Sequence, residues 1–208
     1  VKDPPYSNAI ALADVIAGVV CMAVTRRDYA PYAIFGHGLG AVIAYEVARI
    51  VEARTGRAPM HLFVSGNASP NTAVGGCGSA QWSLAATGDA TGVRGGMAAE
   101  VAAEIAAAAA ASTRCGNYPD SELVDLLPQI ARLPRHFKRS NLMLRAMMST
   151  VRADISAEET YVWLPERGGP VSCPITVFAG MDDEQYTDEA LAGWAGVTRA
   201  GCGVHRLP

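Results

Sequence analysis

The stretch YAIFGHGLGAVIAYEVAR, residues 32–49, decides the fold class of this 208-residue chain. The run 31–36 is short, apolar and contains aromatic and β-branched residues, so it predicts a buried strand. Helical periodicity follows at once over 40–54, and Gly56 is placed to end that helix. A second apolar run, MHLFVSG at 60–66, predicts another buried strand. A strand, a helix and a strand at this spacing predict a parallel sheet and therefore an α/β fold.

The periodicity of the predicted helix also assigns its two faces. Five aliphatic side chains recur on the inner side, and three charged side chains remain available for solvent. The inner residues are Val42, Ile43, Val47, Ile50 and Val51, and the outer ones are Glu46, Arg49 and Glu52.

The remaining elements fit the same α/β class. Residues 7–27 predict a helix capped by Ser7 or Asn8, with an inner face of Ile10, Ala13, Ala17, Val20 and Val24. The run CPITVFAG at 173–180 predicts a third buried strand, followed by a loop that leads into a helix. GVHRLP, at 203–208, has the pattern of a fourth strand.

The middle of the chain has a different composition. From about residue 67 to 116 it is rich in Ala, Gly, Ser and Thr, which predicts loop and a weakly packed alanine-rich helix. Strong helical periodicity returns over 119–133 and 139–163, and these helices are expected to lie over the carboxyl end of the sheet. One apolar face comprises Leu123, Leu126 and Leu127, and the other comprises Leu142, Leu144, Met147, Met148 and Val151.

Composition excludes several classes of partner. A net charge of -3 offers no electrostatic footprint for nucleic acid or an anionic membrane, and no segment is long and apolar enough to cross a bilayer. The five cysteines are widely spaced without a CxxC pair, and the four histidines lack ligand spacing. We therefore expect reduced thiols, no metal site, no bound cofactor and a cytoplasmic location.

The GHGLG turn, residues 36–40, matches the nucleophile elbow G-x-S-x-G of hydrolases except at its centre. Gly36 and Gly40 occupy the outer positions, where a sharp turn from strand to helix favours small residues. Gly38 occupies the nucleophile position and has no side chain with which to attack. His37 is expected to point elsewhere and is not a substitute nucleophile. The alternative is a glycine-rich phosphate-binding turn, although the spacing fits neither G-x-G-x-x-G nor G-x-x-x-x-G-K-S/T.

Several blocks, in the same order, resemble type II thioesterases of polyketide and nonribosomal peptide assembly lines. That family carries G-H-S-M-G-A, then a Phe/Tyr-Glu-Leu/Val-Ala-Arg helix and a strand ending V-S-G; this chain has GHGLGA, YEVAR and VSG. PDSELVDLL and RADISAEETY resemble its lid segments, and CPITVFAGMDDEQYTDEALAGW resembles its late strand, acid loop and Trp-bearing helix. The resemblance implies an α/β-hydrolase fold, a mostly parallel sheet with flanking helices and a helical lid.

The resemblance also assigns site residues one by one. It places Gly38 at the nucleophile position and the backbone N–H of Leu39 in the oxyanion hole. Asp183 falls on the triad acid, with Asp182 as runner-up, although an Asp pair alone is more typical of a solvated loop that caps a helix. The triad histidine is expected after the last residue of this chain. His205 is predicted to be a strand residue and not the triad base.

By the same resemblance, residues 1–208 form one partial α/β-hydrolase domain that lacks the first strands and the end of the core. Residues 1–66 and 165–208 would form the sheet core, 67–117 an Ala/Gly-rich insertion and 118–164 the helical lid.

The implied reaction is hydrolysis of an acyl thioester on the phosphopantetheine of an acyl or peptidyl carrier protein. A serine, activated by a histidine that an aspartate orients, would attack the thioester. Because position 38 is glycine and the histidine is absent, this chain is predicted to be catalytically inactive. The alternative is a non-catalytic module that binds carrier protein or an acyl chain. Either way we expect a monomer or part of a larger multidomain chain.

Overall fold

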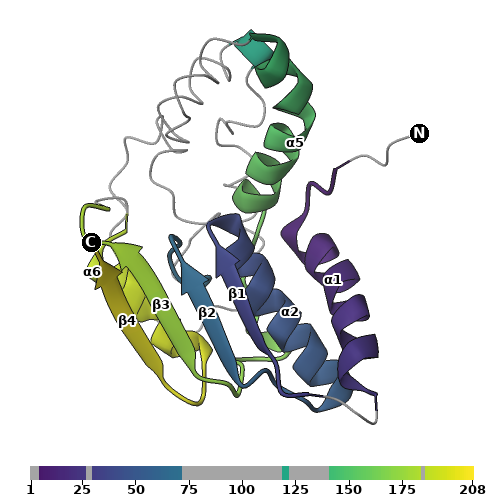
Figure 1. Ribbon diagram of the computed structural model, residues 1–208, viewed down its shortest axis with the longest axis vertical. Helices are drawn as coiled ribbons and strands as arrows, with labels where there is room; N and C mark the ends of the chain where they lie inside the picture. The colour runs from purple at the N-terminus through teal and green to yellow at the C-terminus, as the bar shows by residue number, and fades with distance from the viewer. Residues whose placement is uncertain (1–4, 27–29, 72–118, 122–140, 184–185) are drawn as a thin grey trace.

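The computed structural model describes residues 5–26, 30–71, 119–121, 141–183 and 186–208, without the side chains of 141–145. Its centre is a four-stranded sheet in the order β1-β2-β3-β4, and all neighbouring strands are parallel (Figure 1). The strands are β1 (Ala33–His37), β2 (His61–Ser65), β3 (Ile175–Gly180) and β4 (Cys202–Leu207). The predicted α/β class with a parallel sheet is therefore confirmed, including the fourth strand.

Helices precede and connect these strands. Within the described residues, the α-helices include α1 (Ala9–Val24), α2 (Leu39–Thr55), α5 (Asn141–Glu159) and α6 (Asp188–Ala192), and the 3₁₀ helices include η3 (Pro165–Arg167) and η4 (Gly193–Val197). The Asn8 side chain caps α1 by accepting the N–H groups of Ile10 and Ala11, each at 3.0 Å. Gly56 ends α2 in the left-handed conformation, with φ 69°. None of these described helices has the length and hydropathy needed to cross a membrane.

The main core lies between α2, α6, η4 and one face of the sheet. Leu62 and Val64 of β2 and Ile175 and Val177 of β3 are fully buried there against α2 and against Trp194 of η4. A smaller cluster joins the inner face of α1 to α2, and it includes Ala13, Ala17 and Val24 as predicted.

The opposite face of the sheet departs from the prediction of buried strands. Phe35, on β1, is 64% exposed, while its neighbour Gly36 is buried under α2. Phe35 aligns in register with Phe63 of β2, whose ring stacks against that of Phe178 of β3 at 6.3 Å. The prediction of full burial was wrong for β1, because periodicity in so short a run does not show that only one face is covered.

Helix α5 lies beyond the carboxyl ends of the strands, above the start of α2 (Figure 1). Its last turns pack on α2 through Ala157 and, just after the helix, Tyr161. The predicted apolar face is only partly correct, because Met148 is buried but Met147 is 41% exposed. The side chains of Leu142 and Leu144 lie outside the described residues, as do Leu123, Leu126, Leu127 and residues 72–117 of the predicted insertion.

Candidate active site

The elbow is a tight turn from strand to helix, as predicted. β1 ends at His37 and α2 begins at Leu39, so Gly38 alone connects them. Gly38 has φ 56° and ψ −130°, a combination that residues with a side chain rarely adopt. Its N–H donates to the carbonyl of Ser65 at 2.9 Å, which fixes the turn to the end of β2.

The three glycines of the elbow differ in their steric environments. A Cβ atom at Gly36 would lie 2.1 Å from the Gly40 carbonyl oxygen, so this position accepts only glycine. A Cβ atom at Gly38 or Gly40 would meet no atom within 4 Å beyond the adjoining backbone. The requirement for small residues therefore holds at Gly36 and not at Gly40. A side chain at position 38 would extend into open space, as a nucleophile must.

The two neighbours of Gly38 lie at the end of β1 and at the start of α2. The ring of His37 lies beside Gly66, where an added Cβ would come within 2.8 Å of His37 Cε1. Leu39 is the first residue of α2, so its N–H has no partner inside the helix and lies at the positive end of the helix dipole. Its side chain packs against the apolar cluster that contains Val42 and Tyr161. An N–H group in that position can stabilise a negatively charged oxygen.

The loop that carries Asp182 and Asp183, called the acid loop here for its predicted role, follows β3. Asp183 is partly buried and its N–H donates to the Gly180 carbonyl at 3.3 Å, whereas Asp182 is exposed. Arg206 of β4 donates to the carbonyls of Gly180 and Tyr186, each at 3.0 Å, and it also pairs with Asp188 of α6 at 2.7 Å. Sequence reasoning missed Arg206, because nothing in the strand pattern distinguishes it from a solvated residue.

The topology brings Gly38, predicted to hold the nucleophile position, and Asp183, the predicted triad acid, to one edge of the sheet. Gly38 follows β1 and Asp183 follows β3, and β2 lies between these two parallel strands. Two inter-strand spacings place the strand axes roughly 10 Å apart, a gap that an interposed imidazole can bridge. His205 lies within β4, with its ring 6.1 Å from that of Phe178, and is a strand residue.

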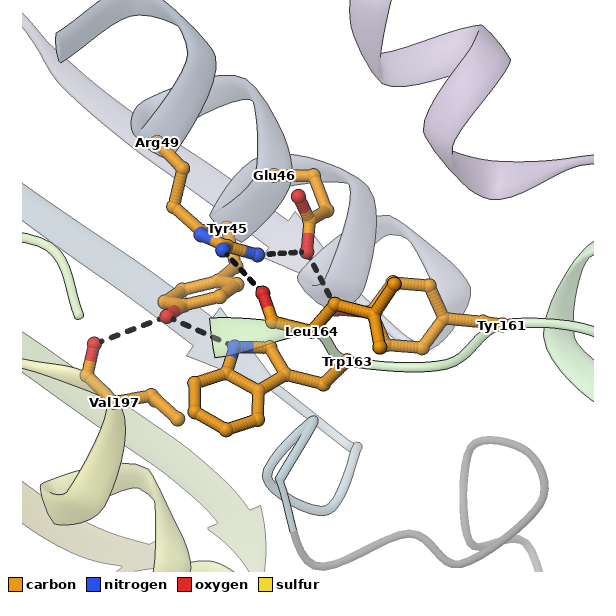
Figure 2. A network of polar contacts seen from close by, with 7 residues as sticks. All are labelled: Tyr45, Glu46, Arg49, Tyr161, Trp163, Leu164 and Val197. Carbon is orange, nitrogen blue, oxygen red and sulfur yellow. Dashed lines mark hydrogen bonds and ion pairs between the residues drawn. The ribbon is translucent and has the colours of Figure 1, made fainter. Parts of the chain in front are cut away.

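The prediction that Glu46, Arg49 and Glu52 face solvent was wrong for the first two, whereas the Glu52 side chain is 21% exposed. Glu46 and Arg49 are only 2% and 3% exposed. Arg49 Nη1 donates to Glu46 Oε1 at 2.8 Å, and the Tyr161 hydroxyl donates to the same oxygen at 2.6 Å (Figure 2). Arg49 Nη2 donates to the Leu164 carbonyl at 2.8 Å. These charged groups can be buried because Tyr161 and Leu164 supply hydrogen-bond partners. Helical periodicity within α2 cannot reveal partners that come from another segment.

Tyr45 adds a second connection from α2. Its hydroxyl donates to the Val197 carbonyl of η4 at 3.2 Å and accepts from Trp163 Nε1 at 3.4 Å (Figure 2). Burial raises the pKa of Tyr45 to about 12, so the hydroxyl stays protonated as a donor. The Arg49 guanidinium lies 5.5 Å from the centre of the Tyr45 ring. The YEVAR motif therefore joins the elbow helix to the segment after α5 and to η4.

Asn67 is the other residue that sequence reasoning missed. It is 1% exposed, and its Nδ2 donates to the Gly38 carbonyl at 2.8 Å. Its own backbone carbonyl accepts the indole N–H of the fully buried Trp194 at 3.1 Å. The only signal in the sequence is its place directly after VSG, at the carboxyl end of β2.

Comparison with known proteins matches this geometry. The model of the thioesterase domain family matches residues 2–208. The chain is 23% identical to the gramicidin S biosynthesis protein GrsT of Aneurinibacillus migulanus, over 98% of the chain and 63% of that protein. RedJ, a thioesterase from the prodiginine pathway of Streptomyces coelicolor, is 25% identical with a TM-score of 0.69, over 99% of the chain and 62% of RedJ.

YbtT, a type II thioesterase from the yersiniabactin pathway, has the same fold, with a TM-score of 0.67 at 20% identity, over 98% of the chain and 67% of YbtT. The chain thus spans about 63% of the length of the curated relative GrsT. Elbow geometry, sheet topology and the match over residues 2–208 agree, and the chain belongs to the thioesterase domain family.

Proposed function

We propose that this chain is part of a type II thioesterase that acts on acyl thioesters of carrier proteins in nonribosomal peptide or polyketide biosynthesis, and that Gly38 leaves it without a nucleophile. The names of GrsT, RedJ and YbtT support the pathway. One observation supports the assignment of the nucleophile position above all others. Gly38 has φ 56° at the junction of β1 and α2, with open space where a side chain would begin.

The proposed chemistry assigns a role to each residue at the carboxyl edge of the sheet. A serine at position 38 would lose its proton to a histidine and form an ester bond to the acyl carbon, and the C–S bond would break to release the pantetheine thiol. The Leu39 N–H would stabilise the tetrahedral oxyanion, and Asp183 would orient the histidine. Water would then release the acid. Glycine at position 38 removes the covalent step without altering the turn.

A second candidate function rests on that unaltered turn. A non-catalytic module could bind an acylated carrier protein, because Gly38 leaves the elbow geometry and the space in front of it intact. The division into sheet core, insertion 67–117 and lid 118–164 belongs to the same proposal. It is supported by the place of α5 beyond the carboxyl ends of the strands (Figure 1).

Hydrolysis of a model acyl thioester tests the thioesterase assignment. Because the relatives are longer, the assay uses the protein extended along its reading frame on both sides of residues 1–208, and thiol release is followed. The Gly38→Ser form is expected to hydrolyse the thioester, whereas the Gly38 form and the matched Gly38→Ala control are not. A folded but inactive Gly38→Ser form would contradict the proposal, as would equal turnover by all three forms.

Binding tests the second candidate. Acylated carrier protein titrated onto the Gly38 form is expected to associate with a Kd in the micromolar range or tighter, whatever the outcome of the hydrolysis assay. Calorimetry that detects no association would remove the binding module from consideration.

A further inference from the structure

The carbonyl of Gly38 accepts two hydrogen bonds. Ala41 N–H donates to it at 2.9 Å from the first turn of α2, and the side-chain amide of Asn67 donates to it at 2.8 Å from the loop after β2. The first bond belongs to the helix, whereas the second comes from a residue 29 positions away in the sequence. This second contact has no role in forming α2 itself.

The Gly38 carbonyl and the Leu39 N–H belong to one planar, trans peptide group, so they point in opposite directions. Any group that fixes the carbonyl therefore also fixes the direction of the N–H. Asn67 is buried on the carbonyl side, and the Leu39 N–H points away from it. Control of this peptide plane matters most at a glycine, because a residue without Cβ rotates more freely about its backbone bonds.

The fold places Asn67 under the elbow through its neighbours. Gly66 has φ 58°, a left-handed conformation that favours glycine, and a Cβ there would lie 2.8 Å from His37 Cε1. This left-handed residue turns the chain under Gly38 directly after β2. The indole of Trp194 then fixes the Asn67 backbone at 3.1 Å. The amide is consequently held in position by the core on one side and by the elbow on the other.

We propose that Asn67 is a positioning residue for the oxyanion donor: its side-chain amide directs the Leu39 N–H by fixing the Gly38 carbonyl. Donation to a carbonyl also polarises the amide, which makes its N–H a stronger donor. This inference rests on the proposed function, in which the Leu39 N–H binds the oxyanion. It assigns to Asn67 a role that does not depend on the residue at position 38.

Nuclear magnetic resonance of the Gly38 protein tests the geometric part without any activity. Asn67→Ala is expected to shift the Gly38 carbonyl carbon and the Leu39 amide nitrogen, whereas Ser69→Ala is not. Ser69 is a matched control, because it is buried in the same loop and its hydroxyl donates to Asn71 at 2.6 Å. Unchanged Gly38 and Leu39 signals in a folded Asn67→Ala protein would overturn the inference.

Asn67→Asp supplies a signature that a merely structural role would not produce. A carboxylate cannot donate to the Gly38 carbonyl, but a protonated carboxyl group can. The chemical shift of the Gly38 carbonyl carbon in this variant is therefore expected to titrate with pH. At low pH it should approach the shift observed in the protein with Asn67. A signal that does not titrate in the folded variant would contradict the inference, even if Asn67→Ala failed to fold.

Kinetics test the catalytic part in the extended Gly38→Ser protein. Asn67→Ala and Asn67→Asp are expected to lower kcat about tenfold with little change in KM, while Ser69→Ala changes neither. Loss of an oxyanion donor itself costs about 10²–10³ in kcat, and an indirect role costs less. If Gly38→Ser is inactive, the proposed function fails, and the spectra then decide only whether Asn67 fixes the peptide group between Gly38 and Leu39. If it is active and Asn67→Ala keeps full kcat, the inference is wrong.

Discussion

Gly38 adopts at no steric cost the backbone angles that a nucleophile at an elbow adopts under strain. For a residue with a side chain that strain is about 1–3 kcal/mol. Under the proposed function, glycine therefore keeps the shape of the turn but supplies no attacking atom. Gly36 has a different, purely steric role, because the backbone of the first turn of α2 leaves no space for a Cβ atom there. Glycine is therefore favoured at these two positions for unrelated physical reasons.

Alanine substitutions at the three elbow glycines separate these reasons. Gly36→Ala is expected to destabilise the protein by more than about 4 kcal/mol or to prevent folding, because its Cβ would clash with backbone. Gly38→Ala should cost about 1–3 kcal/mol from backbone strain alone. Gly40→Ala should be neutral or stabilise by up to about 1 kcal/mol, since it lies in a helix with open space. Urea unfolding of the three variants measures their free energies of unfolding and so checks this order.

Equal losses of stability in Gly36→Ala and Gly38→Ala would contradict the geometry described for the elbow.

At this scale the sequence predicted the turn, because G-x-G-x-G between a strand and a helix has few structural solutions. It could not predict Asn67 or Arg206, since their partners depend on contacts across the carboxyl edge of the sheet that no local pattern shows.

Helix α2 shows how tertiary contacts override a local pattern. Its periodicity assigned Glu46 and Arg49 to solvent, but the chain segment after α5 covers them and supplies Tyr161 and Leu164 as partners. Removing one partner of a buried ion pair costs about 3–5 kcal/mol, because the remaining charge stays desolvated. The pair therefore fixes the position of that segment on the elbow helix.

Helix α5 carries a carboxyl group whose titration is linked to folding. Burial, with smaller contributions from Glu159 and Asp154, raises the pKa of Glu158 to about 7 from 4.5. The folded state thus binds the Glu158 proton more tightly than the unfolded state does. The stability that this protonated carboxyl group confers is fully present below pH 4.5 and is lost as pH rises through about 7. Glu158→Gln should remove this loss of stability at higher pH, because the amide does not ionise.

Urea unfolding of both forms at several pH values measures the effect. The free energy of unfolding of the Gln variant should nearly match that of the parent near pH 4.5 and exceed it by about 3 kcal/mol at pH 8. Glu166→Gln, at an exposed position in η3, serves as the control and should show no such divergence. A difference between Glu158→Gln and the parent that does not change with pH would contradict the burial of Glu158.

The whole molecule brings together groups that are far apart in the sequence. The parallel order β1-β2-β3-β4 places Gly38, Asn67 and Asp183 at one edge, and α5 lies beyond that edge (Figure 1). The sequence predicted this sheet because its apolar runs and glycine turns are strong local signals. It did not predict the exposure of Phe35, because coverage of a sheet face depends on how the helices are distributed in space.

Covalent labelling tests the central claim most directly, since it requires the elbow, the oxyanion donor and the acid loop to act together. The extended Gly38→Ser protein is treated with a fluorophosphonate, which reacts only with an activated serine, and the labelled peptide is identified by mass spectrometry. We predict one adduct, at position 38, and none in the Gly38 form. A folded Gly38→Ser protein that stays unlabelled at position 38 would contradict the claim that this turn is a nucleophile elbow.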